Sequence, residues 1–328
     1  MIDTQQCKDF ESFTIQPFRR KQLKPYYDHM SHDRLKPIFD DRVAQVLEAQ
    51  GLSTDESPRS IYKVDKLFSS LAKFAPGTML PPKRCPELLQ GLALARTCFS
   101  RPSDKQRLSM LPLNASTVAE VTSHPSGSPG LTAFGETKAA SAFRALERGV
   151  EILKGTKAPE PCLAFSRTQF NDKTRLVWGF PYSMTVIEGL LAYPLLQCFK
   201  QISTPMAFAM PNGALGTKLM VASYHKEWAY SIDMSSFDAS ISAELIMEAF
   251  KILRTWFDPS EVEPTTGKTV DEVFSVITRY FVTSPIVMPD GNMYKGRRHG
   301  VPSGSYFTQI IDSIVNVIIC GTISARFG

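Results

Sequence analysis

The sequence has no pair of cysteines spaced as Cys-x-x-Cys, although six cysteines occur among its 328 residues. They are scattered along the chain, at Cys7, Cys85, Cys98, Cys162, Cys198 and Cys320. This pattern indicates neither a zinc site nor a disulfide framework, and it favours a reducing compartment. The first residues also lack the basic and apolar regions of a signal peptide.

Long hydrophobic runs are absent as well. The most apolar stretch, Ile310–Ile323, contains Asp312, Ser313 and Asn316 and is shorter than the roughly 20 apolar residues that cross a bilayer. The sequence therefore predicts a helix buried in protein and no membrane partner. Charge is nearly balanced, with 37 Lys and Arg against 32 Asp and Glu. This small excess of cations fits a nucleic-acid partner without demanding one.

The composition is that of an ordinary globular protein, with 43% hydrophobic and 21% charged residues. The length is enough for two domains or one large domain. Apolar residues at helical spacing predict helices over Leu35–Gln50, Ser60–Phe74 and Pro86–Cys98. None of the three carries residues that suggest chemistry.

An acidic segment, Ser231–Asp238, contains two aspartates, Asp233 and Asp238. The run Trp228–Ile232 predicts a short strand, and apolar residues at helical spacing predict a helix over Ser240–Phe257. Asp233 is then expected at the end of a strand, where a carboxylate can hold a hard metal ion such as Mg²⁺. The alternative is that Asp238 only caps the helix that follows it.

A second segment, Gly300–Thr308, reads Gly-Val-Pro-Ser-Gly-Ser-Tyr-Phe-Thr and predicts a tight turn that opens a helix. Backbone N–H groups and a hydroxyl at such a Ser-Gly turn can bind an anion or a sugar. Thr308, Asp312 and Asn316 stand four residues apart and share one face of that helix. Because the other positions are apolar, this polar face needs partners, either in a network between helices or in a ligand.

Basic residues occur at three further places. Lys173 and Arg175 alternate in a predicted strand, Lys173–Trp178, and therefore lie on one face, where they can contact successive phosphates. Arg175 is the first choice for such a contact, Lys173 the second, and Arg167 a third. A solvated face is the alternative for all of them.

The other two basic places follow turns. Lys138 lies after a loop of turn-forming residues, His124–Gly130, and before a helix expected to end near Leu153. Arg297 and Arg298 follow an Asp-Gly sequence that predicts a β-hairpin. Each could lie along an RNA backbone or in solvent.

The segment between the basic strand and the acidic segment is apolar and helical in period over Tyr182–Ile202. Thr185 and Glu188 have the spacing of a capping box, and Pro194 predicts a break or kink. Pro205–Leu219 then predicts a loop.

The acidic segment and the Ser-Gly turn resemble motifs A (Asp-x-x-x-x-Asp) and B (Ser-Gly-x-x-x-Thr…Asn) of viral RNA-dependent RNA polymerases. The wording Gly-Val-Pro-Ser-Gly-Ser-Tyr-Phe-Thr-Gln is most similar to the partitivirus and picobirnavirus branch, whose genomes are double-stranded RNA. The loop His124–Gly130 resembles motif G at the template entrance, and Lys173–Trp178 resembles the basic motif F. The resemblance covers the later half of the chain well and the first hundred residues hardly at all.

This resemblance implies roles for particular residues. Asp233 is implied as the catalytic metal ligand, for Mg²⁺ or alternatively Mn²⁺. Nucleotide-binding roles are implied for Asp238, Arg175, Lys173, Ser303, Gly304, Thr308, Asp312 and Asn316, and RNA-binding roles for Lys138, Arg297 and Arg298. Many positive-strand polymerases carry Asn where Asp312 stands. Asp238 and Asp312 side by side would repel unless a metal, a cation or a ribose hydroxyl mediates.

The resemblance also implies an α+β fold of the right-hand polymerase type. The expected parts are helical fingers over 1–115, fingers with the template-entrance loop and basic strand over 116–222, palm with motif A over 223–258, a fingers insertion with the hairpin over 259–302, and palm with motif B over 303–328. No Gly-Asp-Asp of motif C occurs in the sequence. We therefore expect an N-terminal fragment that lacks motif C, the rest of the palm and the thumb, and that is inactive alone because two-metal transfer needs further carboxylates.

The implied function is RNA-templated RNA synthesis for viral genome replication and transcription. The expected partners are the RNA template and product, nucleoside triphosphates and, as a further partner that the resemblance allows, a viral capsid protein. The expected location is the host cytoplasm or the virion interior. The alternatives are a noncatalytic viral RNA-binding or structural protein, and another right-hand polymerase such as a reverse transcriptase, against which the Ser-Gly-x-x-x-Thr sequence argues.

Overall fold

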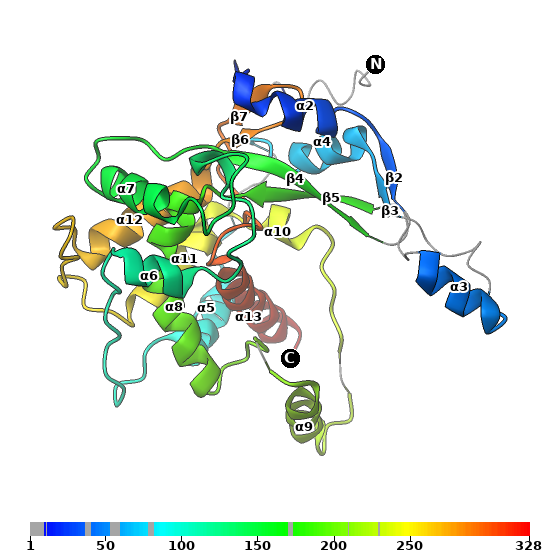
Figure 1. Ribbon diagram of the computed structural model, residues 1–328. Helices are drawn as coiled ribbons and strands as arrows, with labels where there is room; N and C mark the ends of the chain where they lie inside the picture. Colours follow the sequence, from blue (N-terminus) through cyan, green and yellow to red (C-terminus); the bar gives the residue numbers. More distant parts are fainter. Residues whose placement is uncertain are drawn as a thin grey trace.

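The computed structural model describes residues 10, 12–36, 41–52, 60–77, 82–169, 173–208, 210–228 and 230–328. They form an α+β structure with one mixed sheet surrounded by helices (Figure 1). The five strands lie in the order β1 (Thr14–Pro17), β7 (Asn292–Lys295), β6 (Ile286–Val287), β4 (Cys162–Gln169) and β5 (Lys173–Gly179). Strands β4 and β6 are parallel, and the other neighbours are antiparallel.

A small second sheet pairs β2 (Arg34–Lys36) with β3 (Ser60–Tyr62). The helices are α2 (Lys24–Met30), α3 (Asp41–Ala49), α4 (Val64–Ala72), α5 (Pro86–Phe99), α6 (Ala115–Val121), α7 (Ala142–Leu153), α8 (Tyr182–Gln201), α9 (Asn212–Ser223), α10 (Phe237–Ser240), α11 (Ala243–Arg254), α12 (Val270–Thr283) and α13 (Thr308–Phe327), with short 3-10 turns at Lys21–Leu23 and Gly130–Thr132. The predicted helical region 1–115 therefore contains three strands as well.

Helix α8 is the central helix of the core, and it is apolar on nearly every side. It begins at Tyr182, after Pro181, so Thr185 and Glu188 lie inside the helix and the predicted capping box is wrong. It also continues through Pro194, so no break occurs there. Burial against α6, α7 and α12 offsets the cost of about 3 kcal/mol of a proline inside a helix.

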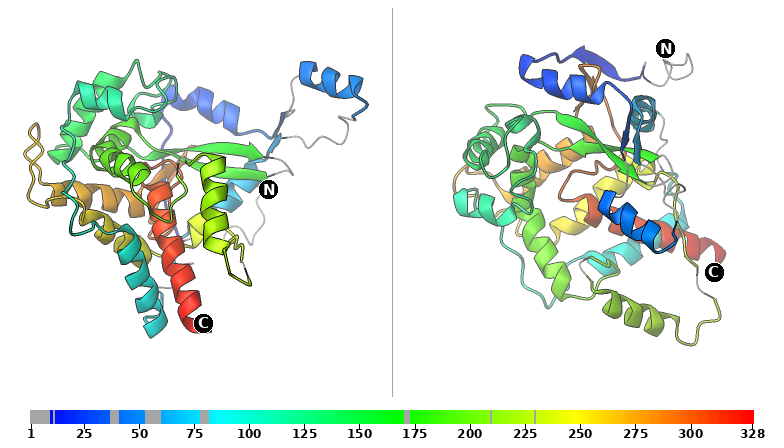
Figure 2. Two further views of the ribbon diagram at one scale, coloured as in Figure 1. Left: turned by 90° about the horizontal axis from the view of Figure 1, so that it is seen from below. Right: turned by 45° about the vertical axis from the view of Figure 1, so that its right-hand side comes forward.

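Helix α13 lies beside α5 and α11 (Figure 2). It is 20 residues long and apolar enough to cross a membrane by length and composition, so the expectation that this run is too short is wrong. Its apolar residues Ile310, Ile311, Ile314, Val315 and Ile318 are nevertheless buried against the protein, as expected for a core helix.

Helices α5 and α13 approach so closely that only glycine fits between them. A Cβ added at Gly91 would lie 2.3 Å from the Ile318 carbonyl oxygen and 2.5 Å from the Thr322 hydroxyl. A Cβ at Gly321 would lie 3.0 Å from the Gly91 Cα. The contact joins the helix of the Ser-Gly turn to the first part of the chain.

We expect Gly91→Ala to lower the free energy of unfolding by about 1–3 kcal/mol, because the two helices must separate to admit the methyl group. Urea unfolding followed by circular dichroism measures this change. Gly216→Ala is the matched control, since Gly216 lies in exposed helix α9 with nothing within 4 Å of an added Cβ. It should leave stability unchanged or raise it. Equal effects of the two substitutions would contradict the close helix contact.

The predicted strand over Trp228–Ile232 does not form. The described residues 228 and 230–236 are not in a strand, and the side chains of Trp228, Tyr230 and Ile232 are exposed. An extended segment needs a neighbour to accept and donate its backbone hydrogen bonds, and no described strand lies beside it. Helix α9, which precedes it in place of the predicted loop, has no buried residue and projects from the body of the molecule (Figure 1).

The local predictions around the site are otherwise confirmed. The basic strand is β5, the Asp-Gly hairpin is β6–β7, and the helices near Leu153 and after Ser240 are α7 and α11. A short helix, α10, precedes α11, whose N-terminus is capped by the Ser242 hydroxyl. These elements place the Ser-Gly turn at the end of β5.

Candidate functional site

The Ser-Gly turn (Gly300–Thr308) docks on the end of β5. The backbone N–H of Trp178 donates to the Ser303 hydroxyl at 3.2 Å. A Cβ added at Gly304 would lie 1.8 Å from the Trp178 carbonyl oxygen and 3.2 Å from the Phe180 nitrogen. Only glycine allows this approach. The predicted phosphate-binding strand and the predicted sugar-binding turn are therefore in direct contact.

The side chain of Thr308 stabilises the backbone of the turn. Its hydroxyl lies 2.7 Å from the Pro302 carbonyl oxygen and 2.9 Å from that of Ser305. Ser303 is exposed and Gly304 is half-buried, so their polar groups can be reached from solvent. The structure thus places Ser303 and Gly304 at the surface of the site, and it uses Thr308 to hold their backbone.

The acidic segment (Ser231–Asp238) lies next to the same turn. The N–H of Val301 donates to the Asp238 carbonyl oxygen at 2.7 Å, and the N–H of Gly300 donates to the Ile241 carbonyl oxygen at 2.7 Å. Ser236 adopts a left-handed conformation with φ of 53°. This conformation is unusual for a residue other than glycine. The two motifs that the sequence predicts to act together therefore meet through backbone hydrogen bonds.

Two carboxyl groups and one guanidinium interact at this junction. Burial raises the pKa of Asp312 to about 8, and the nearby Asp238 carboxylate adds to the rise. Burial also raises the pKa of Asp238, while Arg175 opposes that rise. The Oδ1 atom of Asp312 is buried and has no hydrogen-bond partner in the described residues. Protonation of Asp312 near neutral pH removes the repulsion expected between the two carboxylates.

Asp233 lies on the exposed connection before α10, not at the end of a strand. That part of the prediction is wrong because the strand has no neighbour to pair with. Among the residues that the structure describes, no three His, Cys, Asp or Glu side chains are grouped to hold a metal ion. The implied metal-binding role of Asp233 remains a prediction, and a metal there would take further ligands from substrate phosphates.

The cations on the sheet form a pair that the sequence spacing did not reveal. Arg167 on β4 stands directly opposite Arg175 on β5 in the antiparallel register. Both are exposed, and neither forms an ion pair with a described residue. Like charges directly opposite on a sheet destabilise it unless an anion lies between them. This arrangement favours Arg167 and Arg175 as a phosphate contact; Lys173 begins β5.

Arg297 does not face solvent, so its predicted RNA contact is wrong. Its guanidinium is buried, lies over the Trp178 ring at 4.6 Å, and donates to the carbonyl oxygens of Gly300 at 2.6 Å and Phe281. Arg298 is exposed. Side chains leaving a hairpin alternate in direction, and this alternation could have separated the two arginines at the level of sequence.

The remaining predicted residues lie apart from this cluster of contacts or at its edge. Lys138 is half-buried, its ammonium lies 5.5 Å from the Tyr182 ring, and burial lowers its pKa. Asn316 is exposed one turn beyond Asp312, and it accepts a hydrogen bond from the Cys320 thiol at 3.4 Å. Their predicted contacts with RNA and nucleotide remain predictions.

Sequence reasoning missed one residue of this site, Glu188. It was interpreted as a capping residue, but it is fully buried and both its oxygens accept hydrogen bonds from the Ser-Gly turn. A signal was present, since Glu188 is an acidic residue within an otherwise apolar helix, and buried acids need specific partners.

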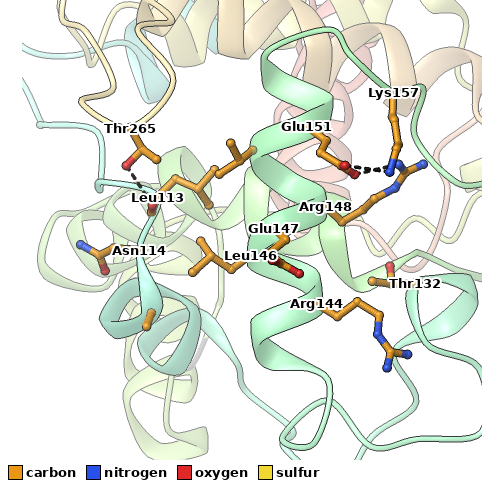
Figure 3. Close-up of a pocket in the computed structure, with 12 residues that line it drawn as sticks. Leu113, Asn114, Thr132, Arg144, Leu146, Glu147, Arg148, Glu151, Lys157 and Thr265 are labelled. Carbon is orange, nitrogen blue, oxygen red and sulfur yellow. Dashed lines mark hydrogen bonds and ion pairs between the residues drawn. The ribbon is translucent and has the colours of Figure 1, made fainter.

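A cavity of about 850 Å³ is lined by α7, by residues 113–115 and by Thr132, Lys157 and Thr265 (Figure 3). Its cations Arg144, Arg148 and Lys157 are paired with acidic residues. None of its lining residues belongs to β5, the acidic segment or the Ser-Gly turn. The cavity is therefore not the site that the two motifs build.

Known proteins match the part of the chain that contains the basic strand, the acidic segment and the Ser-Gly turn. Residues 170–326 match the family described as viral RNA-dependent RNA polymerase. The RNA-directed RNA polymerase of Cryptosporidium parvum virus 1 (strain KSU-1) is 35% identical over 176 residues, which cover 51% of this chain and 31% of that protein. The RNA-directed RNA polymerase of White clover cryptic virus 1 is 24% identical over 172 residues, covering 46% and 28%. The match thus spans about a third of these relatives.

Solved structures share the fold. The RNA-dependent RNA polymerase of a human picobirnavirus superposes with a TM-score of 0.63 at 13% identity, covering 95% of this chain and 64% of that chain. The Sicinivirus 3Dpol polymerase gives 0.62 at 16% identity, covering 80% and 56%. The predicted α+β fold of the right-hand polymerase type is confirmed.

Proposed function

We propose that this chain, a relative of the viral RNA-dependent RNA polymerases of double-stranded RNA viruses, supplies the fingers and the first part of the palm of such an enzyme. The reaction would be RNA-templated transfer of nucleotides from triphosphates to an RNA 3′ end. The observation that supports the proposal is the contact of Gly304 with the end of β5, which joins the turn proposed to bind the sugar to the strand proposed to bind the triphosphate. The backbone bond from Val301 to Asp238 adds the acidic segment to the same place.

Each part of the site would act on a different part of the nucleotide. Arg175 and Arg167 would bind the triphosphate by charge-assisted hydrogen bonds. Ser303 and the backbone at Gly304 would face the base and sugar. Such fixed donors favour the developing charge of a transition state because they need little reorganisation.

Asp312 would bind the ribose as a neutral acid. Because its pKa is raised to about 8, the group is protonated near neutral pH and can donate a hydrogen bond. An asparagine at this position would donate from its amide, so protonation gives Asp312 a comparable role. Asp238, beside it, would accept from a ribose hydroxyl.

Viral RNA-dependent RNA polymerases in general use divalent metal ions. We assign Asp233 as a ligand for Mg²⁺, with Mn²⁺ as an alternative, because a hard ion is held by one or two carboxylates and by substrate phosphates. Asp233 supplies one such carboxylate, and its side chain is exposed. The ion, when bound, would supply neutralising charge at the phosphates.

RNA template and product would be the macromolecular partners, with exposed Arg298 and half-buried Lys138 as contacts to the RNA backbone. A viral capsid protein is a further proposed partner, and the host cytoplasm or virion interior the proposed location. No observation favours a noncatalytic RNA-binding protein over the polymerase.

Triphosphate binding by the purified chain tests the proposal. We expect Arg175→Ala to raise the dissociation constant for a magnesium ribonucleoside triphosphate about tenfold, because a charge-assisted contact is lost. Isothermal titration calorimetry measures the constant. Arg279→Ala removes an exposed arginine of α12 and should change it by less than about twofold. Equal binding by wild type and Arg175→Ala would remove β5 from the proposed site.

A further inference from the structure

A buried carboxyl group lies beneath the Ser-Gly turn. Glu188, on α8, has no exposed surface. Its Oε1 lies 2.6 Å from the Ser305 hydroxyl, and its Oε2 accepts the N–H of Tyr306 at 2.8 Å. We propose that Glu188 is a positioning residue that fixes the backbone of the Ser-Gly turn through these two hydrogen bonds, beneath the residues proposed to face the nucleotide.

The location of Glu188 gives no other reason for a carboxyl group. Its neighbours on α8, Ile187, Gly189, Leu190 and Leu191, are all buried, and an apolar residue would fill the same space. Replacing a buried polar group by an apolar one of similar size is often neutral or stabilising when its partners are satisfied elsewhere. Here the partners are a hydroxyl and a backbone N–H of the turn, and the N–H of Tyr306 would be left without an acceptor.

The two bonds act on the part of the turn that the nucleotide site needs. Ser305 and Tyr306 follow Gly304 directly, and the Ser305 hydroxyl also accepts the N–H of Phe307 at 3.0 Å. The Tyr306 hydroxyl donates to the Val121 carbonyl oxygen. The turn is therefore held on one side by β5, through Ser303 and Gly304, and on the other by α8, through Glu188.

The protonation state follows from the surroundings. Burial raises the pKa of Glu188 to about 8, although the bonds from Ser305 and Tyr306 lower it in part. Tyr306 on the turn, Tyr280 on α12 and Cys162 on β4 interact electrostatically with Glu188, and the pKa of each is raised, so all three are neutral near pH 7. The buried cation nearby, Arg297, interacts with Tyr280 and Cys162.

A neutral carboxyl group matches both partners at once. The Ser305 hydroxyl donates to one oxygen, Oε1, and the N–H of Tyr306 donates to the other, Oε2, and a protonated carboxyl group keeps this acceptor capacity. An ionised carboxylate would accept the same two bonds, but its charge is costly in this apolar place. Glutamine at 188 is likewise neutral: its amide oxygen can accept the N–H of Tyr306, and its amide N–H can donate to the Ser305 hydroxyl, which is able to accept. Leucine fills the space and makes neither bond.

The first test measures the turn itself in the purified 328-residue chain. Hydrogen–deuterium exchange followed by mass spectrometry reports on the peptide over 300–308, with the peptide over α12 as an internal reference. We expect Glu188→Leu to speed exchange in 300–308 about tenfold or more, and Glu188→Gln to leave it within about twofold of wild type. Equal protection in Glu188→Leu, or loss of protection in Glu188→Gln, would overturn the proposal.

A pH series separates this role from simple packing. The pKa of Glu188 is higher in the folded chain than the ordinary value of 4.5. Its contribution to stability is therefore fully present below about 4.5 and is lost as the pH rises through about 8. Glutamine does not titrate, so the melting temperature of Glu188→Gln relative to wild type should rise between about pH 4.5 and pH 8 and level off above that. A difference that stays constant with pH would contradict the neutral carboxyl group.

The consequence for nucleotide binding rests on the proposed function, and a separate measurement tests it. Dissociation constants for a magnesium ribonucleoside triphosphate should rise about tenfold in Glu188→Leu and change less than about twofold in Glu188→Gln. If exchange behaves as expected but wild type binds no triphosphate, the proposed function fails and the positioning role stands. If wild type and Glu188→Leu bind equally well, Glu188 does not position the nucleotide site.

Discussion

Asp233→Ala is expected to abolish RNA synthesis by the complete polymerase, with a fall in nucleotide incorporation of about 10³-fold or more. The carboxylate is the proposed metal ligand, and its loss removes the charge that holds the ion at the phosphates. Because Asp233 is exposed, the substitution should leave the fold and RNA binding intact. Primer extension on an RNA template measures synthesis, and filter binding of the same RNA measures the retained affinity.

Glu227→Ala is the control for this experiment. Glu227 is an exposed acid on the same connection between α9 and α10, so its loss changes the local charge by the same amount. We expect Glu227→Ala to keep synthesis within about twofold of wild type. Synthesis retained in Asp233→Ala would remove the metal assignment, and loss in both variants would indicate a general effect of charge on this segment.

Gly304→Ala is expected to have the largest effect of any single methyl group in the site. Its Cβ would lie 1.8 Å from the Trp178 carbonyl oxygen, far inside van der Waals contact, and both partners are backbone. Either the Ser-Gly turn or β5 must move. We expect the free energy of unfolding to fall by about 3 kcal/mol, measured by urea unfolding. Triphosphate binding should fall about tenfold or more, because a shift of the turn misplaces the groups that face the nucleotide.

Gly213→Ala is the control for the methyl group. An added Cβ at Gly213 has nothing within 4 Å, and the residue lies at the exposed start of α9. It should leave stability and triphosphate binding unchanged within about 0.5 kcal/mol. If Gly304→Ala proved as mild as Gly213→Ala, the contact between the Ser-Gly turn and β5 would be disproved.

The sequence predicted best where the structure depends on near neighbours. Alternation gave β5 over Lys173–Gly179, helical spacing gave α11, and an Asp-Gly turn gave the β6–β7 hairpin. Helix α11 and the β6–β7 hairpin form through interactions within a few residues, and β5 pairs with β4, the strand that directly precedes it in the chain. The Ser-Gly turn was also predicted, because its chemistry lies in consecutive residues. The comparisons confirm the polymerase resemblance that these two motifs carry.

Predictions failed where a residue's structure is determined by partners that lie far away in the sequence. Glu188 lies 117 residues from Ser305, so its spacing from Thr185 on the same helix gave a wrong interpretation. Arg297 is held by carbonyl oxygens of α12 and of the turn, which a local pattern cannot show. Trp228–Ile232 has the composition of a strand, but a strand also needs a neighbour, and none of the described strands lies there.

The protonation state of Asp312 is a further property that a local sequence pattern cannot predict. The sequence placed Asp312 on the polar face of a helix and predicted repulsion with Asp238, which is correct about proximity. It could not show that Asp312 is buried enough to keep its proton. The depth of a side chain in the molecule decides that property, and depth depends on the whole fold.

The contact of Gly304 with the end of β5 means that the two halves of the site cannot move independently. A displacement of the strand by a few tenths of an ångström, when Arg175 engages an anion, would push directly on the turn because no soft side chain lies between the two backbones. Anion binding by Arg175 at one end of a substrate and the position of the Ser-Gly turn at its other end are thus mechanically coupled through Gly304.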